Sequence, residues 1–201
     1  GVTPKEQQMD GTKNMPTLPF QFVGNNLALD FVNTRIVLQG VQVDLLSTPE
    51  QLVSWLATAG IDFDSNIDEK DLKQVHKLRE AISRLITAFR RGDEAPTASL
   101  SVFNSYLLRR KRVQQLECED SGFCLKPAEV DRTLSSILGE IATSTADLLT
   151  TTPATKIRKC EGADCVLVFK DISRTQKRRW CSMEVCGNRA KAATHYKQKK
   201  T

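Results

Sequence analysis

Two short stretches with matching cysteine spacing decide the fold of the C-terminal part of this chain: they read CEGADC at 160–165 and CSMEVC at 181–186. In each stretch four residues separate the two cysteines, so a turn can aim both thiolates at one point. Fifteen residues lie between the two pairs. This pattern predicts a tetrahedral metal site with the ligands Cys160, Cys165, Cys181 and Cys186.

The expected metal is one zinc ion, because four soft sulfur ligands suit zinc. Such a site leaves no position for a bound water, so we expect a structural role and no zinc-dependent hydrolysis. Two disulfides or four unrelated thiols are the alternatives, and the symmetric spacing and lysine-rich surroundings argue against both. His195 is the only nearby competitor as a ligand. It follows Cys186 by nine residues, about 180° around a helix, and should point away from the metal.

The same segment resembles the CGNR zinc finger, and the resemblance rests on WCSM at 180–183 and CGNRAK at 186–191. Further upstream it rests on Arg158, Cys160, Glu161, Cys165, Phe169, Asp171, Ser173, Arg174, Arg178 and Arg179. The N-terminal run LALDFVNT at 27–34 looks like the opening of the ABATE domain, which precedes this finger in a bacterial family described as stress-induced transcription regulators. The resemblance implies structural zinc, double-stranded DNA as the partner and regulation of transcription under stress.

Charge is divided unevenly along the chain. The formal net charge is +5, but residues 156–201 hold 13 Lys and Arg against 4 Asp and Glu, a balance of +9. The preceding 155 residues therefore carry a balance of −4. Four thiolates and one zinc ion would lower the tail to about +7. A basic module on a mildly acidic body is typical of a polyanion binder with a separate partner domain.

The composition is that of an ordinary globular protein, with 201 residues, 40% of them hydrophobic and 26% charged. That length allows one moderate domain and a small metal-stabilised one. No apolar run approaches the roughly 20 residues that a membrane span needs, and no secretion signal opens the chain. We therefore expect a cytoplasmic, nucleoid-associated protein without a membrane partner.

Periodicity predicts a mainly α fold with one small β-hairpin (α+β), followed by a treble-clef-like zinc finger with four cysteine ligands. We expect an extended arm over 1–19, a helical ABATE-like domain over 20–152 and the basic finger over 153–201, with a linker near 151–155. Capping and apolar spacing predict helices from Asn25 or Asn26, from Thr48 to Gly60, from Asp68 to Gly92, from Thr97 or Ser99 to the basic run at 109–112, and from Pro127 toward Pro153. The expected apolar face of the second helix comprises Leu52, Val53, Leu56 and Ala59.

The hairpin is expected from two short strands, 113–118 and 123–125, around Ser121-Gly122. Cys118 and Cys124 could then face each other across the strands. Small buried hydrophobes are the favoured interpretation of this pair over a redox switch, because a reducing compartment disfavours disulfides.

A polar cluster lies toward the end of the first predicted helix: Asp30, Asn33, Thr34 and Arg35. It could line a pocket for a small-molecule effector or form a domain contact. Capping and internal hydrogen bonding are the alternative, and a single sequence favours the alternative.

In the finger we expect a strand over 166–169, a polar connection over 171–177 and a helix capped by Ser182, with Phe169 and Trp180 covering a small core. Metal binding would then supply the folding free energy of this module. On the last helix, Ala190 and Ala193 share the inner side with Cys186. The outer side comprises Asn188, Lys191, Ala192, His195 and Lys199.

This outer side is slim, polar and basic, so it could enter a major groove, where Asn and Lys can contact base edges and phosphates. Backbone phosphates suit the basic side chains of the preceding connection, namely Arg174, Lys177, Arg178 and Arg179. Arg189 lies between the two sides, and either a phosphate contact or support of the metal turn fits it.

The leading interpretation is a DNA-binding transcription regulator whose helical body senses a ligand or pairs subunits as a homodimer. An RNA- or ribosome-associated protein is the first alternative, but the basic tail has few aromatics for base stacking. A protein-binding adaptor is the second, and a basic helix face without an apolar anchor disfavours it. We expect no enzyme, because no phosphate loop, nucleophile motif or histidine–carboxylate pair is evident.

Overall fold

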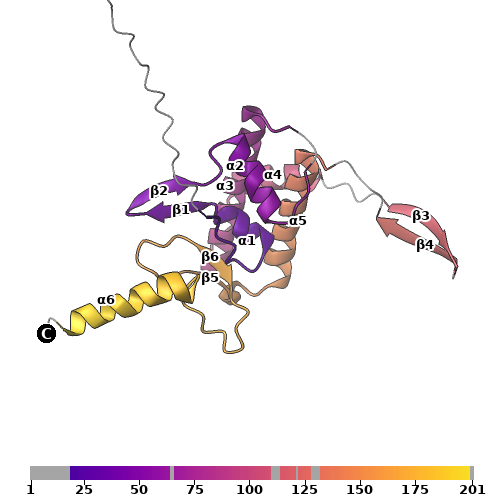
Figure 1. Cartoon of the computed structure of the whole chain (residues 1–201). Coiled ribbons are helices and arrows are strands. Elements are labelled where there is room, and N and C mark those ends of the chain that lie inside the picture. Colours follow the sequence, from indigo (N-terminus) through magenta and orange to yellow (C-terminus); the bar gives the residue numbers. More distant parts are fainter. Residues whose placement is uncertain (1–18, 64–65, 110–113, 121, 128–131, 200–201) are drawn as a thin grey trace, which may run out of the picture.

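The structure, a computed structural model, describes residues 19–63, 66–109, 114–120, 122–127 and 132–199 (Figure 1). Almost all of the arm predicted at 1–19 lies outside these ranges, as do residues 110–112 of the basic run. The described part is an α+β fold, as predicted. Among its helices none is both long enough and apolar enough to span a bilayer.

The body is built around one long helix, α3 (Glu69–Arg91), which packs against α1 (Leu27–Val32), α2 (Pro49–Thr58), α4 (Thr97–Leu107) and α5 (Leu134–Thr151). Asp68 caps α3, since its side chain accepts hydrogen bonds from the backbone N–H groups of Lys70 and Asp71. Gly92 ends the helix with a φ of 72°, a left-handed conformation that glycine adopts freely. The predicted apolar stripe of this helix is buried in the main core, with Phe89 partly buried, so this helix is confirmed.

Three antiparallel strand pairs are described, whereas the sequence predicted one. They are β1 (Arg35–Leu38) with β2 (Val41–Asp44), β3 (Gln114–Glu119) with β4 (Gly122–Pro127), and β5 (Ile157–Lys159) with β6 (Val168–Lys170). The first pair was missed, and its first residue, Arg35, had been placed toward the end of the first predicted helix. Gln39 and Gly40 form its two-residue turn with φ values of 50° and 80°.

Several local predictions were wrong. Trp55, 1% exposed, occupies the buried face of α2, while Val53 is 43% exposed. Helix α4 starts after Pro96, whose side chain has no acceptor, so neither Thr97 nor Ser99 caps it. Helix α5 starts at Leu134, and the residue that was expected to open it, Pro127, ends β4 instead.

The β3–β4 hairpin is confirmed, but its cysteines do not face each other. Cys118 pairs with Phe123, and Cys124 pairs with Glu117, so the two thiols lie on neighbouring rungs. Cys118 is also exposed, which contradicts its interpretation as a buried hydrophobe. Figure 1 shows this hairpin standing away from the helical body, on the side opposite α6 (Asn188–Gln198).

The zinc-finger segment is joined to the body through a shared core and hydrogen bonds. Ile36 and Leu45 of the body pack in one cluster with Phe169 and three of the four cysteines. The buried side chain of Asn33 pairs with both backbone polar groups of Val168: its Nδ2 donates to the Val168 carbonyl at 2.8 Å, and its Oδ1 accepts from the Val168 N–H at 2.9 Å. Lys170 N donates to the Gly24 carbonyl at 2.8 Å. The finger is therefore part of one folded unit with α1.

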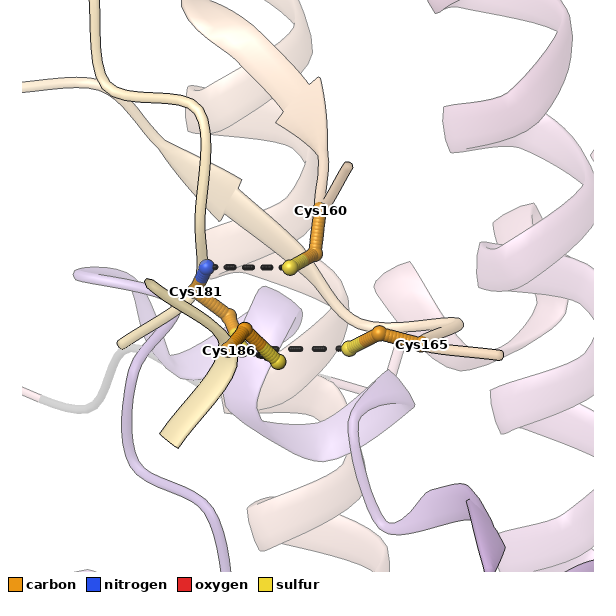
Figure 2. A group of neighbouring side chains, drawn as sticks. All are labelled: Cys160, Cys165, Cys181 and Cys186. Carbon is orange, nitrogen blue, oxygen red and sulfur yellow. Dashed lines mark hydrogen bonds between the residues drawn. The ribbon is translucent and has the colours of Figure 1, made fainter. Parts of the chain in front are cut away.

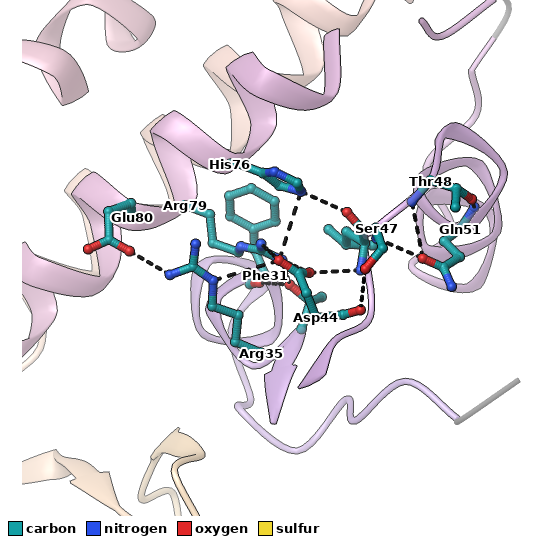
Figure 3. Close-up of polar contacts among 11 residues, drawn as sticks. Phe31, Arg35, Asp44, Ser47, Thr48, Gln51, His76, Arg79 and Glu80 are labelled. Atoms are coloured by element: carbon teal, nitrogen blue, oxygen red, sulfur yellow. Dashed lines mark hydrogen bonds and ion pairs between the residues drawn. The ribbon is translucent and has the colours of Figure 1, made fainter. Parts of the chain in front are cut away.

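A partly buried ion pair fixes the β1–β2 hairpin on α3 (Figure 3). The guanidinium of Arg79, 1% exposed, donates to both carboxylate oxygens of Asp44 and to Thr34 Oγ1. Burial alone would raise the pKa of Asp44, but the hydrogen bonds and charge of Arg79 outweigh it and hold that pKa below its usual value. His76 Nε2 donates to the Leu46 carbonyl at 2.7 Å beside this pair.

Replacing Asn33 by Ala should destabilise the whole described unit. The substitution removes both partners of Val168 from a site where Asn33 is 2% exposed, and two unpaired backbone groups cost about 2–4 kcal/mol. Urea unfolding measures the loss. Asn104→Ala, at an exposed position of α4, is the control and should stay within about 0.5 kcal/mol of the parent protein. Equal stability of the two variants would contradict this role of Asn33.

Candidate metal centre

The four predicted ligands come from two turns that meet at one point (Figure 2). Cys160 directly follows β5, and Cys165 lies in the turn that leads to β6. Cys181 precedes a short π-helix, η2 (Met183–Gly187), which carries Cys186. Ser182 caps η2, because its Oγ accepts a hydrogen bond from Val185 N at 3.3 Å, as predicted. This start of a helix places Cys186 beside the first cysteine pair.

The sulfur atoms have the spacing of a tetrahedral zinc site. All four lie within 4.8 Å of one another, with Cys165 and Cys181 at 3.8 Å and Cys181 and Cys186 at 3.6 Å. A zinc–sulfur bond of about 2.3 Å gives a tetrahedron edge of about 3.8 Å. Among the described residues this group contains cysteines alone, and His195 is exposed and stands outside it. The donor set therefore fits one zinc ion with no open position.

Backbone N–H groups and one glycine shape the pocket around the sulfurs. Cys181 N donates to Cys160 Sγ at 3.2 Å, and Gly162 N donates to the same sulfur at 3.4 Å. Such bonds stabilise a thiolate. A Cβ at position 162 would lie 3.0 Å from Cys186 Sγ and 3.4 Å from Cys160 Sγ, so glycine is needed for this close approach.

Crowding makes the thiols titrate very differently from one another. A hydrogen bond from Cys181 lowers the pKa of Cys165 to about 5, and the same bond and burial raise the pKa of Cys181. Burial raises the pKa of Cys186 to about 11. The Cys165 thiol thus ionises readily while the thiols of Cys181 and Cys186 resist ionisation, and a divalent cation stabilises four thiolates together.

Comparison with protein-family models gives two matches that cover most of the chain. Residues 25–152 match the ABATE family, described as "Putative stress-induced transcription regulator", and residues 156–199 match the CGNR zinc finger. The chain belongs to the ABATE family. Its four cysteines are accordingly the structural zinc site of a CGNR finger, with one ion. A comparison with curated proteins found no match. Neither family description names an enzyme.

The last helix of the CGNR match, α6, points away from the body (Figure 1). In α6, Asn188, Arg189 and all side chains over 191–195 are exposed, and no acidic residue occurs in the helix. Lys199, just beyond α6, is exposed too. Ala193 was expected on an inner side with Cys186, but α6 leaves the finger before that turn and Ala193 is exposed. The residues predicted for the outer side thus lie on α6 or directly after it, and all of them are exposed.

The predicted basic residues of the preceding connection differ in their surroundings. Arg174 and Lys177 are exposed on the loop between β6 and Cys181, with no carboxylate partner among the described residues. The exposed Arg179 donates to Glu161 at 2.6 Å and lies over the Trp180 ring. Arg178 is half-buried, and its guanidinium donates to the carbonyls of Val23, Trp180 and Cys181 above the Phe169 ring. Arg178 therefore supports the zinc turn.

An acidic residue whose structural role was not predicted shapes this loop. Asp171 is 2% exposed, and it accepts hydrogen bonds from the N–H and hydroxyl of Ser173 and from the N–H of Arg178. Burial opposes ionisation, but these bonds outweigh it and lower the pKa of Asp171. An acidic side chain within a basic run was the available signal, since an isolated carboxylate there is a natural acceptor for turn N–H groups.

The polar cluster predicted near α1 is divided among separate roles. Asp30 accepts from Gly24 N at 2.7 Å, and burial raises its pKa to about 6. Asn33 joins the finger, Thr34 Oγ1 donates to the Phe31 carbonyl, and Arg35 pairs with Glu80 at 2.5 Å. Internal hydrogen bonding and a domain contact, both anticipated for this cluster, account for the printed contacts of all four side chains.

Replacing Cys165 or Cys181 by Ser should abolish stoichiometric zinc and lower the thermal midpoint, because three sulfurs hold the ion less tightly and the shared core loosens. Elemental analysis of protein purified without chelator gives the zinc content. The double variant Cys118→Ser/Cys124→Ser is the control and should keep one zinc per chain, since both residues belong to the distant hairpin. Loss of zinc in that control, or its retention in the site variants, would contradict the assigned ligands.

Substituting Gly162 by Ala should weaken zinc retention without removing a ligand, because the new methyl group presses on Cys186 Sγ at 3.0 Å. Competition with a chromogenic chelator should show release at a chelator concentration at least about tenfold lower, which corresponds to about 1.4 kcal/mol. Ala163→Ser, at the exposed neighbouring position of the same turn, should behave like the parent protein.

Proposed function

We propose that this protein is a DNA-binding transcription regulator in which the zinc site holds α6 out toward duplex DNA while the ABATE body senses a ligand or mediates assembly. One observation carries the proposal: α6 is an exposed, basic helix without an acidic residue, fixed at its base by Cys186. The family description, with its words on stress and transcription, supports the biological setting. A nucleoid location follows from the same proposal.

The dimensions of α6 suit a major groove. Its 11 residues give a length of about 16 Å, and an α-helix about 10–12 Å across fits a groove about 12 Å wide. Asn188, Lys191 and His195 follow one another at helical spacing along one side. Asn and Lys can contact base edges there, and His195 can donate or accept at an edge.

Phosphate contacts are assigned to the side chains that the protein itself leaves free. Arg174 and Lys177 on the loop after β6, together with Arg189 and Lys199, are exposed. Arg179 is retained in this set because its ion pair with Glu161 is exposed and can exchange for a phosphate. Arg178 is left out, since it is half-buried and its Nε and Nη2 donate to three carbonyls.

The other function classes have weaker support. Single-stranded RNA binding usually needs aromatic platforms, and Trp180, half-buried, is already covered by Arg179. The described part brings together no nucleophile, base and orienting carboxylate in a cleft, and the proposal includes no enzymatic step. Pairing of two copies stays a prediction, and the exposed apolar side chains of the β3–β4 hairpin, Leu116, Phe123 and Leu125, support it.

Binding to duplex DNA, measured by fluorescence anisotropy over a range of salt concentrations, tests the proposal. The variant Arg174→Gln/Lys177→Gln/Lys191→Gln should bind more weakly, and the slope of log K against log [salt] should fall by about 2–3, because each lost phosphate contact contributes about 0.9. Asn188→Ala should chiefly reduce discrimination between DNA sequences.

The matched control is Lys70→Gln/Lys73→Gln/Lys77→Gln, which removes the same charge from an exposed part of α3. Its slope should equal that of the parent protein. Zinc content is measured for each variant, so that loss of the fold is recognised. An unchanged slope in the first variant, or tighter binding to single-stranded RNA than to duplex DNA, would exclude the proposed function.

A further inference from the structure

A cleft of about 250 Å³ lies between the helical body and the zinc finger. One side of α3 forms its first wall, from Ser83 through Thr87 to Arg90 and Arg91. The finger supplies the opposite wall with Lys159 of β5 and Val168 of β6. Lining residues between 32 and 42 of the body complete the cleft, which thus joins segments that are far apart in the sequence.

Positive charge dominates this cleft. Its lining contains Arg35, Arg79, Arg90, Arg91 and Lys159 and no Asp or Glu. Two of these cations are neutralised by carboxylates that do not line the cleft, because Arg79 pairs with Asp44 and Arg35 pairs with Glu80, as Figure 3 shows. Arg90, Arg91 and Lys159 have no ion pair with any described residue. About three uncompensated charges therefore converge on one small space.

The protein orients one of these cations in advance. Arg90 is half-buried, and its Nε donates to the Ile157 carbonyl at 3.0 Å, which holds the side chain against the base of the finger. Both terminal guanidinium nitrogens remain for a ligand, in the paired geometry that suits carboxylate and phosphate oxygens. Holding an unpaired cation in a partly buried position is costly unless an anion compensates it.

The remaining lining sets the character of the ligand. Val32, Ile86, Val166 and Val168 provide apolar surface, and Ser83 and Thr87 add hydroxyl groups. Thr87 Oγ1 donates to the Ser83 carbonyl at 2.8 Å and keeps its lone pairs as acceptors. The volume lies slightly below the roughly 300–1,000 Å³ of ordinary ligand pockets, so the ligand is small.

We propose that the cleft between α3 and the finger binds a small organic anion, with a phosphate or carboxylate head held by Arg90, Arg91 and Lys159 and a short apolar body against Ile86 and Val168. Because the two walls belong to the two segments, the bound anion also ties the finger to α3. This site is independent of nucleic-acid binding by α6.

Titration calorimetry with the zinc-loaded full chain tests the site, with phenyl phosphate and benzoate as the two anionic probes and phenol as the neutral one. We expect saturable binding of at least one anion and none of phenol. The variant Arg91→Gln/Lys159→Gln should lower the affinity at least tenfold, because both side chains are exposed contributors to the cleft. Comparison of the two anions identifies the head group.

The control Lys73→Gln/Lys77→Gln removes the same charge from α3 outside the cleft and should stay within twofold of the parent affinity. Ser83→Leu, which fills the cleft without changing its charge, should also abolish binding and serves if the first variant does not fold. In NMR spectra, addition of the anion should change the backbone amide chemical shifts of Ser83, Thr87 and Val168.

Three results would overturn the proposal: no saturable binding of either anion, equal affinity in the cleft and control variants, or shifts confined to α6. A fourth is loss of duplex DNA affinity in Arg91→Gln/Lys159→Gln without any anion binding, because the cleft would then be part of the DNA surface. The salt dependence of DNA binding is measured separately, so failure of one proposal leaves the other testable.

Discussion

The convergence of four cysteine sulfurs at the spacing of a zinc tetrahedron is the constraint on which the C-terminal structure depends. The two turns that carry them have few apolar residues of their own, and their thiols resist ionising together without a cation. Zinc removes that conflict and fixes the start of η2. The direction of α6 then follows from the position of Cys186, so a metal site without chemistry of its own determines where the basic helix points.

The finger does not complete its core alone, which qualifies the expectation that metal binding supplies its entire folding free energy. Ile36 and Leu45 of the body close the cluster around Phe169, and Asn33 pairs with Val168 as a neighbouring strand would. Metal and body therefore stabilise the same small unit. This joint construction also creates the cleft, because α3 and β5 are held close while Arg90, Arg91 and Lys159 have no carboxylate partner among the described residues.

The sequence predicted the ligands and the long helices well, because local rules govern both. Cysteine spacing, the Asp68 cap and the glycine at 92 act within a few residues. The β1–β2 hairpin was not predicted, because a short apolar run fits a helix as well as a strand. The start of α5 was placed too early, because Pro127 can open a helix or end a strand. The roles of Arg178 and Asp171 were missed for a different reason: a basic run in sequence does not say which guanidinium will meet carbonyl groups after folding.

By itself the sequence determined that four sulfurs bind one ion, that the charge is concentrated beyond residue 155, and that long amphipathic helices form the body, since each follows from residue type and spacing. Only the tertiary structure decided that Asn33 joins the finger to α1, that Arg178 is a supporting residue, and that Arg90, Arg91 and Lys159 surround one cleft. These depend on contacts between residues far apart in the chain, which hydrophobic burial and hydrogen-bond pairing select after the local elements have formed.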